Sequence, residues 1–340
     1  MDSNFLIPEP MIDKKELDSI DVLTKKYEKM CEPGWISKTG KKVSKIIPEK
    51  VKKVTKEARK SISEKEIYMQ MMKLVGEGFK VVEEQASKYS LNEKEIIKRL
   101  NKKTNSNIKS IDEICLLRSY DIAATTNTYK IQDIVAALAE GAGTGVAGFV
   151  GLPFNLVLST FLYFRAVQSI AMFYGFDVKN DNAELVIASD VFKNALNPSN
   201  DMIENEAGTY IGKIMVITQT EVVKQTAKKS WTDMASKNGV TLLITQMRAL
   251  ANKSAQKALE KAGQKGLEKN MFSEVLEQIG KKLSLSSTGK LAMGVGAIFG
   301  ALIDTAQMNS VLEYADTFYR KRFILEKESN ILKLKEKNEK

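Results

Sequence analysis

The fold is decided by EGAGTGVAGFVGLPFNLVLSTFLYFRAVQSIAMFYGFD, residues 140–177, a long and nearly uncharged window in a lysine-rich chain. A second, shorter window of the same kind, LAMGVGAIFGALID, covers residues 291–304. Apolar segments of this length leave water either for a protein core or for lipid. We therefore expect the two windows to pack against each other at the centre of the molecule.

Glycines within these windows occur at a spacing that suits close helix packing. Residues four apart lie on one side of a helix and allow a second backbone to approach closely. The helix-packing glycines predicted in this way are Gly141 and Gly145 in the first window and Gly296 and Gly300 in the second.

The first window also matches the dinucleotide-binding pattern GxGxxG, at Gly143, Gly145 and Gly148. That pattern requires a preceding strand, a following uninterrupted helix and an acidic residue about 20 positions further on. Here Pro153 interrupts the following helix, and the first acid after the pattern is Asp177, which lies too far along. The glycines therefore favour helix packing, and no cofactor is expected.

Length alone allows the first window to cross a membrane, since residues 141–164 are uncharged and exceed the ~20 residues that a span needs. The pattern nevertheless predicts a helix that begins at Pro153 and is stopped by Gly175. Arg165 lies near the centre of that helix, where an arginine costs roughly 2.5–3.5 kcal/mol in a bilayer. We favour a buried core helix over two alternatives, a membrane-dipping hairpin with residues 291–304 and a true membrane span.

Three charged residues border or interrupt the windows: Glu140, Arg165 and Asp304. If the windows pack together, these residues are candidates for a buried and mutually paired cluster, because an unpaired buried charge is costly. Such a cluster fixes the register of the helices, unless its members reach solvent. Alternatively, Glu140 and Asp304 bind a divalent ion and form a hydrolase site.

The remainder of the chain predicts an all-α fold, a multi-helix bundle around the two glycine-rich apolar helices with no significant β-sheet. Only 6 prolines occur in 340 residues, and long stretches are rich in residue types that favour helix. Helices are predicted over residues 11–31 and 64–88 and from Asn92 to about residue 102, with several more between 181 and 283. The last helix is predicted from about Thr288 to Ile324.

Charge and helical pattern divide the chain into four segments. These are an N-terminal helix and lead-in (1–34), a basic amphipathic segment (35–62), a helical core domain (63–328) and a charged tail (329–340). The tail is expected to be disordered, because its sequence is dominated by charged side chains.

Positive charge is concentrated in the basic segment, residues 35–62, of a chain whose formal net charge is +10. Pro48 suits the first turn of a helix on which Val51 and Val54 share one face and lysines occupy the rest. Such helices bind anionic lipid with about 1 kcal/mol per Lys or Arg, and a tryptophan suits the headgroup level. The membrane-surface candidates are Trp35, Lys41, Lys42, Lys45, Lys50, Lys52, Lys53 and Lys56.

The basic segment has other interpretations. A short helix that packs its narrow apolar stripe on the core leaves the same lysines solvated. Nucleic acid is not expected, because no aromatic side chains interleave the lysines. The expected partner is an anionic membrane surface or a membrane protein, and the oligomeric state is not indicated.

Composition bounds the chemistry. The sequence contains no histidine, which excludes Ser–His and Cys–His catalytic machinery and ordinary zinc sites. The two cysteines, Cys31 and Cys115, lack metal-ligand spacing and favour a reducing compartment, and the first residues do not form a secretory signal. We expect a cytoplasmic protein at the inner face of the plasma membrane, without catalytic, cofactor-binding or metal-binding residues. The composition therefore favours a protein that is not an enzyme.

Several blocks of the sequence resemble the bacterial EcsC family: YEKMCEPGW (27–35), KIIPEKVKK (45–53), the window at 140–177 and GAIFGALIDTAQMNSVLEYADTFYRKRF (296–323). The residues before Trp35 depart from the family's pattern. The family is associated with genes of ABC transporters and has no reaction that carries over to particular residues. The resemblance implies a helper or regulator of transport or envelope proteins, with a carboxylate hydrolase or a membrane-inserting hairpin protein as alternatives.

Overall fold

The computed structural model describes residues 6–32, 64–87, 92–128, 152–196, 198, 206–217, 239–262, 266–286 and 305–339. Within these ranges the chain is helical and contains no strand, which confirms the predicted all-α fold. A further helix covers residues 119–128. The elements are α1 (Lys14–Met30), α4 (Glu64–Ser87), α5 (Glu93–Thr104), the 3-10 helix η1 (Asp112–Leu116), α7 (Leu152–Phe173), α8 (Asn182–Ala195), α9 (Glu206–Val216), α12 (Gly239–Ala262), α13 (Leu267–Ser286) and α15 (Thr305–Asn338).

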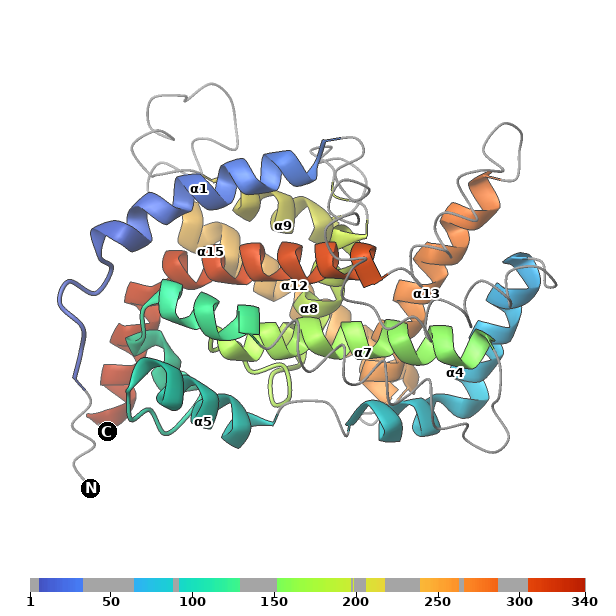
Figure 1. Cartoon of the computed structure of the whole chain (residues 1–340), viewed down its shortest axis with the longest axis horizontal. Helices are drawn as coiled ribbons and strands as arrows, with labels where there is room; N and C mark the ends of the chain where they lie inside the picture. The colour runs from blue at the N-terminus through green and yellow to red at the C-terminus, as the bar shows by residue number, and fades with distance from the viewer. Residues whose placement is uncertain are drawn as a thin grey trace.

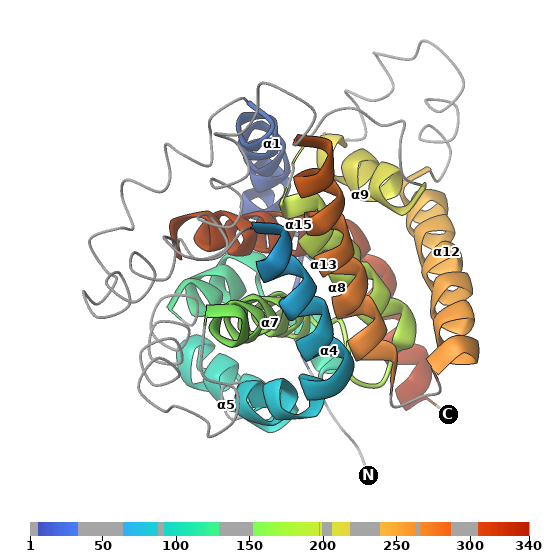
Figure 2. The ribbon, with the colours of Figure 1, turned by 90° about the vertical axis from the view of Figure 1, so that its right-hand side faces the viewer.

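Three helices form the centre of the molecule. Helices α7 and α15 pack against each other, and α8 packs against both (Figure 1). Around them, α1 and α9 cover α15, α4 and α5 pack on α7, and α12 and α13 pack on α8 (Figure 2). The three central helices are thus enclosed by the others, and they carry most of the buried charged side chains described below.

Helix α7 is the core helix that the sequence predicts. It begins at Leu152, one residue before Pro153, and Gly175 follows its end with a φ of 84°, a conformation that favours glycine. The N–H of Phe176 donates to the carbonyl of Ala171 at 3.0 Å and closes the last turn. The proline near its start and the glycine after its end therefore predict the bounds of this helix.

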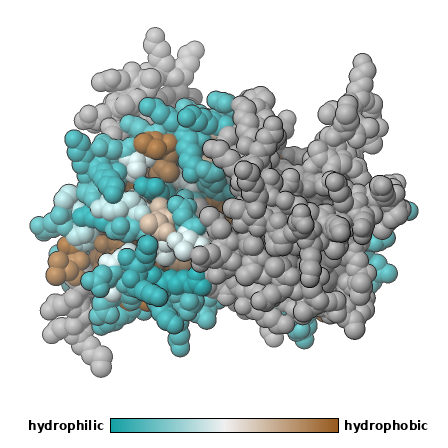
Figure 3. All heavy atoms as spheres, in the orientation of Figure 1, coloured by the Kyte–Doolittle hydropathy of each residue, from teal (hydrophilic) through white to brown (hydrophobic). Residues whose placement is uncertain are grey.

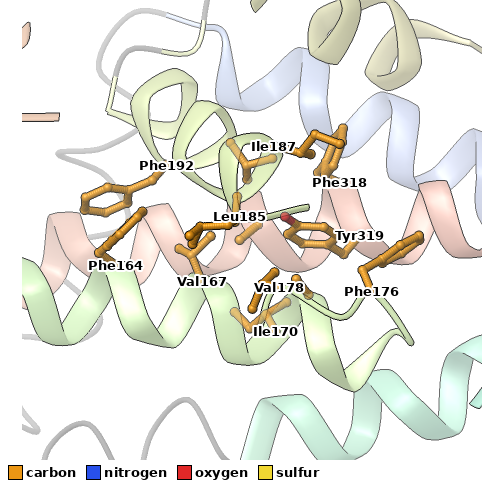
Figure 4. Close-up of a cluster of buried hydrophobic side chains, with 14 of the residues drawn as sticks. Phe164, Val167, Ile170, Phe176, Val178, Leu185, Ile187, Phe192, Phe318 and Tyr319 are labelled. Atoms are coloured by element: carbon orange, nitrogen blue, oxygen red, sulfur yellow. The ribbon is translucent and has the colours of Figure 1, made fainter. Parts of the chain in front are cut away.

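The apolar surface of α7 is covered by protein. Among the described helices, α7 alone has the length and composition of a membrane span, over Leu156–Phe173, and 89% of that window is buried. Figure 4 shows side chains of α7 and α8 interdigitating beside Tyr319 of α15. Phe164 and Phe192, for example, lie with ring centroids 5.8 Å apart. This packing buries the apolar surface of α7 inside the protein, so lipid is not needed to remove that surface from water.

The predicted contact between the two glycine-rich windows falls outside the described residues. Gly141, Gly145, Gly296 and Gly300 all belong to undescribed ranges, as does the second window itself. Helix α15 begins directly after that window and packs along α7. The pairing of the windows stays a prediction.

The C-terminal tail differs from its prediction. Instead of ending near Ile324, α15 continues to Asn338, so residues 329–338 are helical rather than disordered. Ile331 and Leu334 lie three apart on one face of the helix and are buried with Cys115. The prediction was wrong because it weighed the charge of the tail above the spacing of its two apolar residues.

Candidate functional site

Two acidic residues at the start of α8 form the base of the candidate site. Asp181 is the N-cap, and its carboxylate accepts hydrogen bonds from the backbone N–H groups of Ala183 (2.9 Å) and Glu184 (3.4 Å). Asp181 and Glu184 both lie at the positive end of the helix dipole, which favours carboxylates. The glutamate is buried, with only 2% of its surface exposed.

Arg322 of α15 pairs with Glu184 through two hydrogen bonds. Its Nη1 and Nη2 donate to the two carboxylate oxygens at 2.6 and 2.8 Å, and its Nε donates to Glu326 one turn further along α15. The guanidinium also lies over the ring of Phe176, 3.9 Å from the centroid. Burial acts to lower the pKa of Arg322, but the two carboxylates outweigh burial and raise it. This fully buried guanidinium is therefore charged and held on three sides.

Arg248 of α12 also pairs with Glu184. Its Nη1 donates to Glu184, and its Nη2 donates to Asp181 at 2.6 Å. Burial acts to raise the pKa of Asp181, but Arg248 and the backbone N–H groups lower it overall. Glu184 is thus shared by two arginines, and one ion-pair network joins α8, α12 and α15.

A cavity of about 380 Å³ lies beside this network. The turn between α7 and α8, the 3-10 helix η1, and the helices α12 and α15 all line it. Its polar lining includes Arg248 and Glu326, and its apolar lining includes Ile244, Leu325 and Leu334. The network therefore forms one wall of a space large enough for a small molecule.

A second buried ion pair joins the first and last helices. Lys327 of α15 donates to both oxygens of Glu16 on α1, at 2.8 and 2.9 Å, and neither side chain is exposed. Glu16 also accepts hydrogen bonds from Arg118 and from the backbone N–H of Ser119, while its side chain completes a capping box with Asp13. Burial lowers the pKa of Lys327, and Glu16 acts in the opposite direction.

A third buried cation, Lys321 of α15, has no carboxylate partner among the described residues. Its Nζ donates to the hydroxyl of Thr24 and to the carbonyl of Met215, the latter at 2.7 Å. Burial lowers its pKa to about 7, and Asp21 and Glu28 of α1 offset this only in part. Lys321 therefore weakens the folded state at neutral pH instead of stabilising it.

Replacing Lys321 with methionine is expected to stabilise the protein at pH 7 by about 2 kcal/mol, because a buried amine without a counter-ion is removed. The gain should shrink as the pH rises toward 10. The unfolded lysine keeps its proton in that range while the folded one loses it near pH 7, so wild-type stability rises with pH through this group. Urea denaturation of both proteins at pH 7 and 9.5 measures the difference. A stability difference that does not change with pH would contradict the assignment.

The sequence-predicted site residues are only partly within the described structure. Arg165 is half-buried and pairs with Glu268 of α13 at 2.8 Å, and Gln168 donates to the same carboxylate at 2.9 Å. Glu140 and Asp304, its predicted partners, lie outside the described residues, as do Trp35 and all the candidate lysines from Lys41 to Lys56. The paired cluster with Glu140 and Asp304 stays a prediction.

Sequence reasoning missed the network around Glu184. A signal was present for Glu184, which lies in the apolar run AELVIA, but not for Arg322, which follows Arg320 and Lys321. A charged residue inside an apolar helical run requires a partner, by the argument that was applied to Arg165. In the part of the chain that is described, no group of three or more Cys, Asp or Glu side chains is arranged to hold a metal ion.

The fold and the site together define a helical bundle whose central helices are joined by buried ion pairs. The model of the EcsC protein family matches residues 14–324, and the chain belongs to this family. No curated protein and no solved structure matches the chain.

Proposed function

We propose that this chain is a non-enzymatic protein attached to the inner face of the bacterial plasma membrane, where it assists or regulates transport or envelope proteins. The observation that carries the proposal is the position of the charge. Residues 35–62 contain ten lysines and arginines against two glutamates, which is +8 of the net +10 of the chain. A polybasic segment of this kind is attracted to anionic lipid.

The described surface supports attachment over insertion. On the face shown in Figure 3, the described residues are mainly hydrophilic, and hydrophobic side chains occur in small separate groups. Elsewhere in the described chain, exposed large apolar side chains include Val22 and Leu17 of α1. The apolar window of α7 is already buried in the bundle. These features favour electrostatic binding at the surface over a hairpin that enters the bilayer.

The carboxylates of the ion-pair network argue for a non-catalytic role. Glu184 and Asp181 are held by arginine guanidiniums, and Glu16 is held by a lysine and an arginine. A carboxylate fixed in this way is a poor metal ligand and a weak general base, because its charge and its lone pairs are already engaged. The hydrolase alternative relies on Glu140 and Asp304, which lie outside the described residues.

Binding to lipid vesicles tests the proposal. The protein is expected to co-sediment with vesicles of phosphatidylglycerol and phosphatidylcholine at low salt, to be released by high salt, and not to bind phosphatidylcholine alone. Changing Lys50, Lys52, Lys53 and Lys56 to glutamine should weaken binding at least about tenfold. The matched control changes four exposed lysines of α5 to glutamine: Lys94, Lys98, Lys102 and Lys103.

The control should bind within about twofold of the wild type, since it alters the net charge equally but at another place. Equal weakening in both variants contradicts a specific attachment segment. Release by detergent alone supports the inserted hairpin, and failure to bind anionic vesicles at low salt removes the proposal.

A further inference from the structure

One face of α15 presents a polar stripe to the cavity. Glu326, Ser329, Asn330 and Lys333 all line the cavity, and their spacing of three, four and seven residues places them on one side of the helix. The stripe has an acid at one end and a base at the other, about 10 Å apart along the helix axis at 1.5 Å per residue.

The acidic end is buried and only half engaged. Oε1 of Glu326 accepts the hydrogen bond from Nε of Arg322, and no described residue donates to Oε2. The side chain of Glu326 is 11% exposed, and it lines the cavity. Burial raises the pKa of this carboxyl, and Arg322 offsets that only in part. A positively charged donor from the cavity would therefore find an acceptor and would favour its ionised form.

The basic end lies at the rim. Lys333 is exposed and forms no ion pair or hydrogen bond with the residues that the structure describes. The apolar part of the wall contains Ile244, Leu325 and Leu334. The cavity thus offers a little-exposed acceptor, apolar side chains and an exposed cation.

Other charged groups of the lining are already engaged by ion pairs or hydrogen bonds. Lys337 binds Asp112 at 2.7 Å, and Arg248 binds Asp181 and Glu184. Asp177 accepts hydrogen bonds from the backbone N–H groups of the turn that follows it. Among these described groups, Glu326 keeps one carboxylate oxygen without a donor although Arg322 pairs with the other, and Lys333 has no ion pair, so these two groups are left to select a ligand by its charge.

We propose that this cavity binds a small linear zwitterion, with an ammonium group on Glu326, an acidic group on Lys333 and an aliphatic chain against the apolar wall. The site is independent of lipid attachment through residues 35–62. It does not require a reaction, because recognition by two opposite charges and an apolar wall is a binding function.

Three probes of the same chain length separate the parts of the site. 6-Aminohexanoate carries both charges, hexylamine carries only the ammonium group, and hexanoate carries only the carboxylate. Isothermal titration calorimetry on the full chain is expected to show 6-aminohexanoate binding most tightly, hexylamine at least about tenfold more weakly, and hexanoate most weakly, since each lost charge–charge contact contributes on the order of 1 kcal/mol or more.

Variants at the two ends test the assignment. Glu326→Gln keeps an acceptor for Arg322 and should weaken 6-aminohexanoate and hexylamine at least about tenfold while leaving hexanoate unchanged. Lys333→Glu alters an exposed residue and should leave folding intact. It should weaken 6-aminohexanoate and strengthen hexylamine. The matched control is Lys335→Glu, which makes the same charge change on α15 at an exposed lysine that does not line the cavity.

The outcomes that overturn the proposal are distinct. One is the absence of 6-aminohexanoate binding at millimolar concentration. Another is equal binding of all three probes. A third is an equal effect of Lys333→Glu and Lys335→Glu, which would show a response to net charge only. The Lys333→Glu result decides the case even if Glu326→Gln does not fold.

Discussion

Changing Arg322 to methionine is expected to lower the free energy of unfolding by about 3–5 kcal/mol, the largest effect of any single substitution considered for this protein. The substitution leaves Glu326 buried without its partner and leaves Glu184 with Arg248 alone. It also removes the contact of the guanidinium with the ring of Phe176. Urea denaturation followed by circular dichroism measures the loss.

Two control variants show whether the loss of stability comes from the contacts of Arg322. Arg322→Lys keeps the positive charge but loses the two-pronged contact with Glu184, so an intermediate loss is expected. Lys335→Met, on an exposed face of the same helix, should change stability by less than about 0.5 kcal/mol. A loss below about 1 kcal/mol for Arg322→Met would mean that the network does not hold the central helices together.

Changing Glu16 to glutamine is expected to destabilise the fold by about 3 kcal/mol, the second large effect. Glutamine still serves as the N3 residue of a capping box, so the start of α1 is preserved and mainly the charge is removed. Lys327 then remains fully buried without a counter-ion. Chemical denaturation gives the magnitude.

A double-mutant cycle identifies the source of the Glu16 effect. Glu16→Gln combined with Lys327→Met removes both charges, and the pair should be destabilised by less than the sum of the two single variants, by about 1 kcal/mol or more. Strict additivity would show that the two side chains do not act on each other. In that case the loss in Glu16→Gln belongs to the contacts with Arg118 and Ser119.

Helix ends were predictable where a local signal sets them. Pro153 and Gly175 bracket α7, and Asn92 caps α5 by accepting from the N–H of Glu95 at 2.9 Å. Such capping signals involve only residues that are neighbours in the sequence, so a single sequence is enough to recognise them. The end of α15 was missed although Ile331 and Leu334 have helical spacing, because their burial against η1 and the N-terminal segment depends on tertiary packing.

The candidate site was less predictable than the fold. That Arg165 needs an acidic partner followed from its position in an apolar helix, but the choice of Glu268, 103 residues away, depends on how α13 packs. The same limit applies to Glu184 and Arg322, which lie 138 residues apart. A charge in an apolar run reveals that a partner exists, and only the packing of the helices reveals which one.

The separation of α7 and α15 along the sequence has a consequence for biosynthesis. Helix α7 is complete at Phe173, yet the helix that packs along it begins only at Thr305 and ends at Asn338. At about 5–20 residues per second, a ribosome needs roughly 10–30 s to make the intervening chain. During that interval α15 cannot cover the apolar flank of the nascent α7, so the bundle closes only after α15 has been synthesised, and chaperones can bind the exposed flank until then.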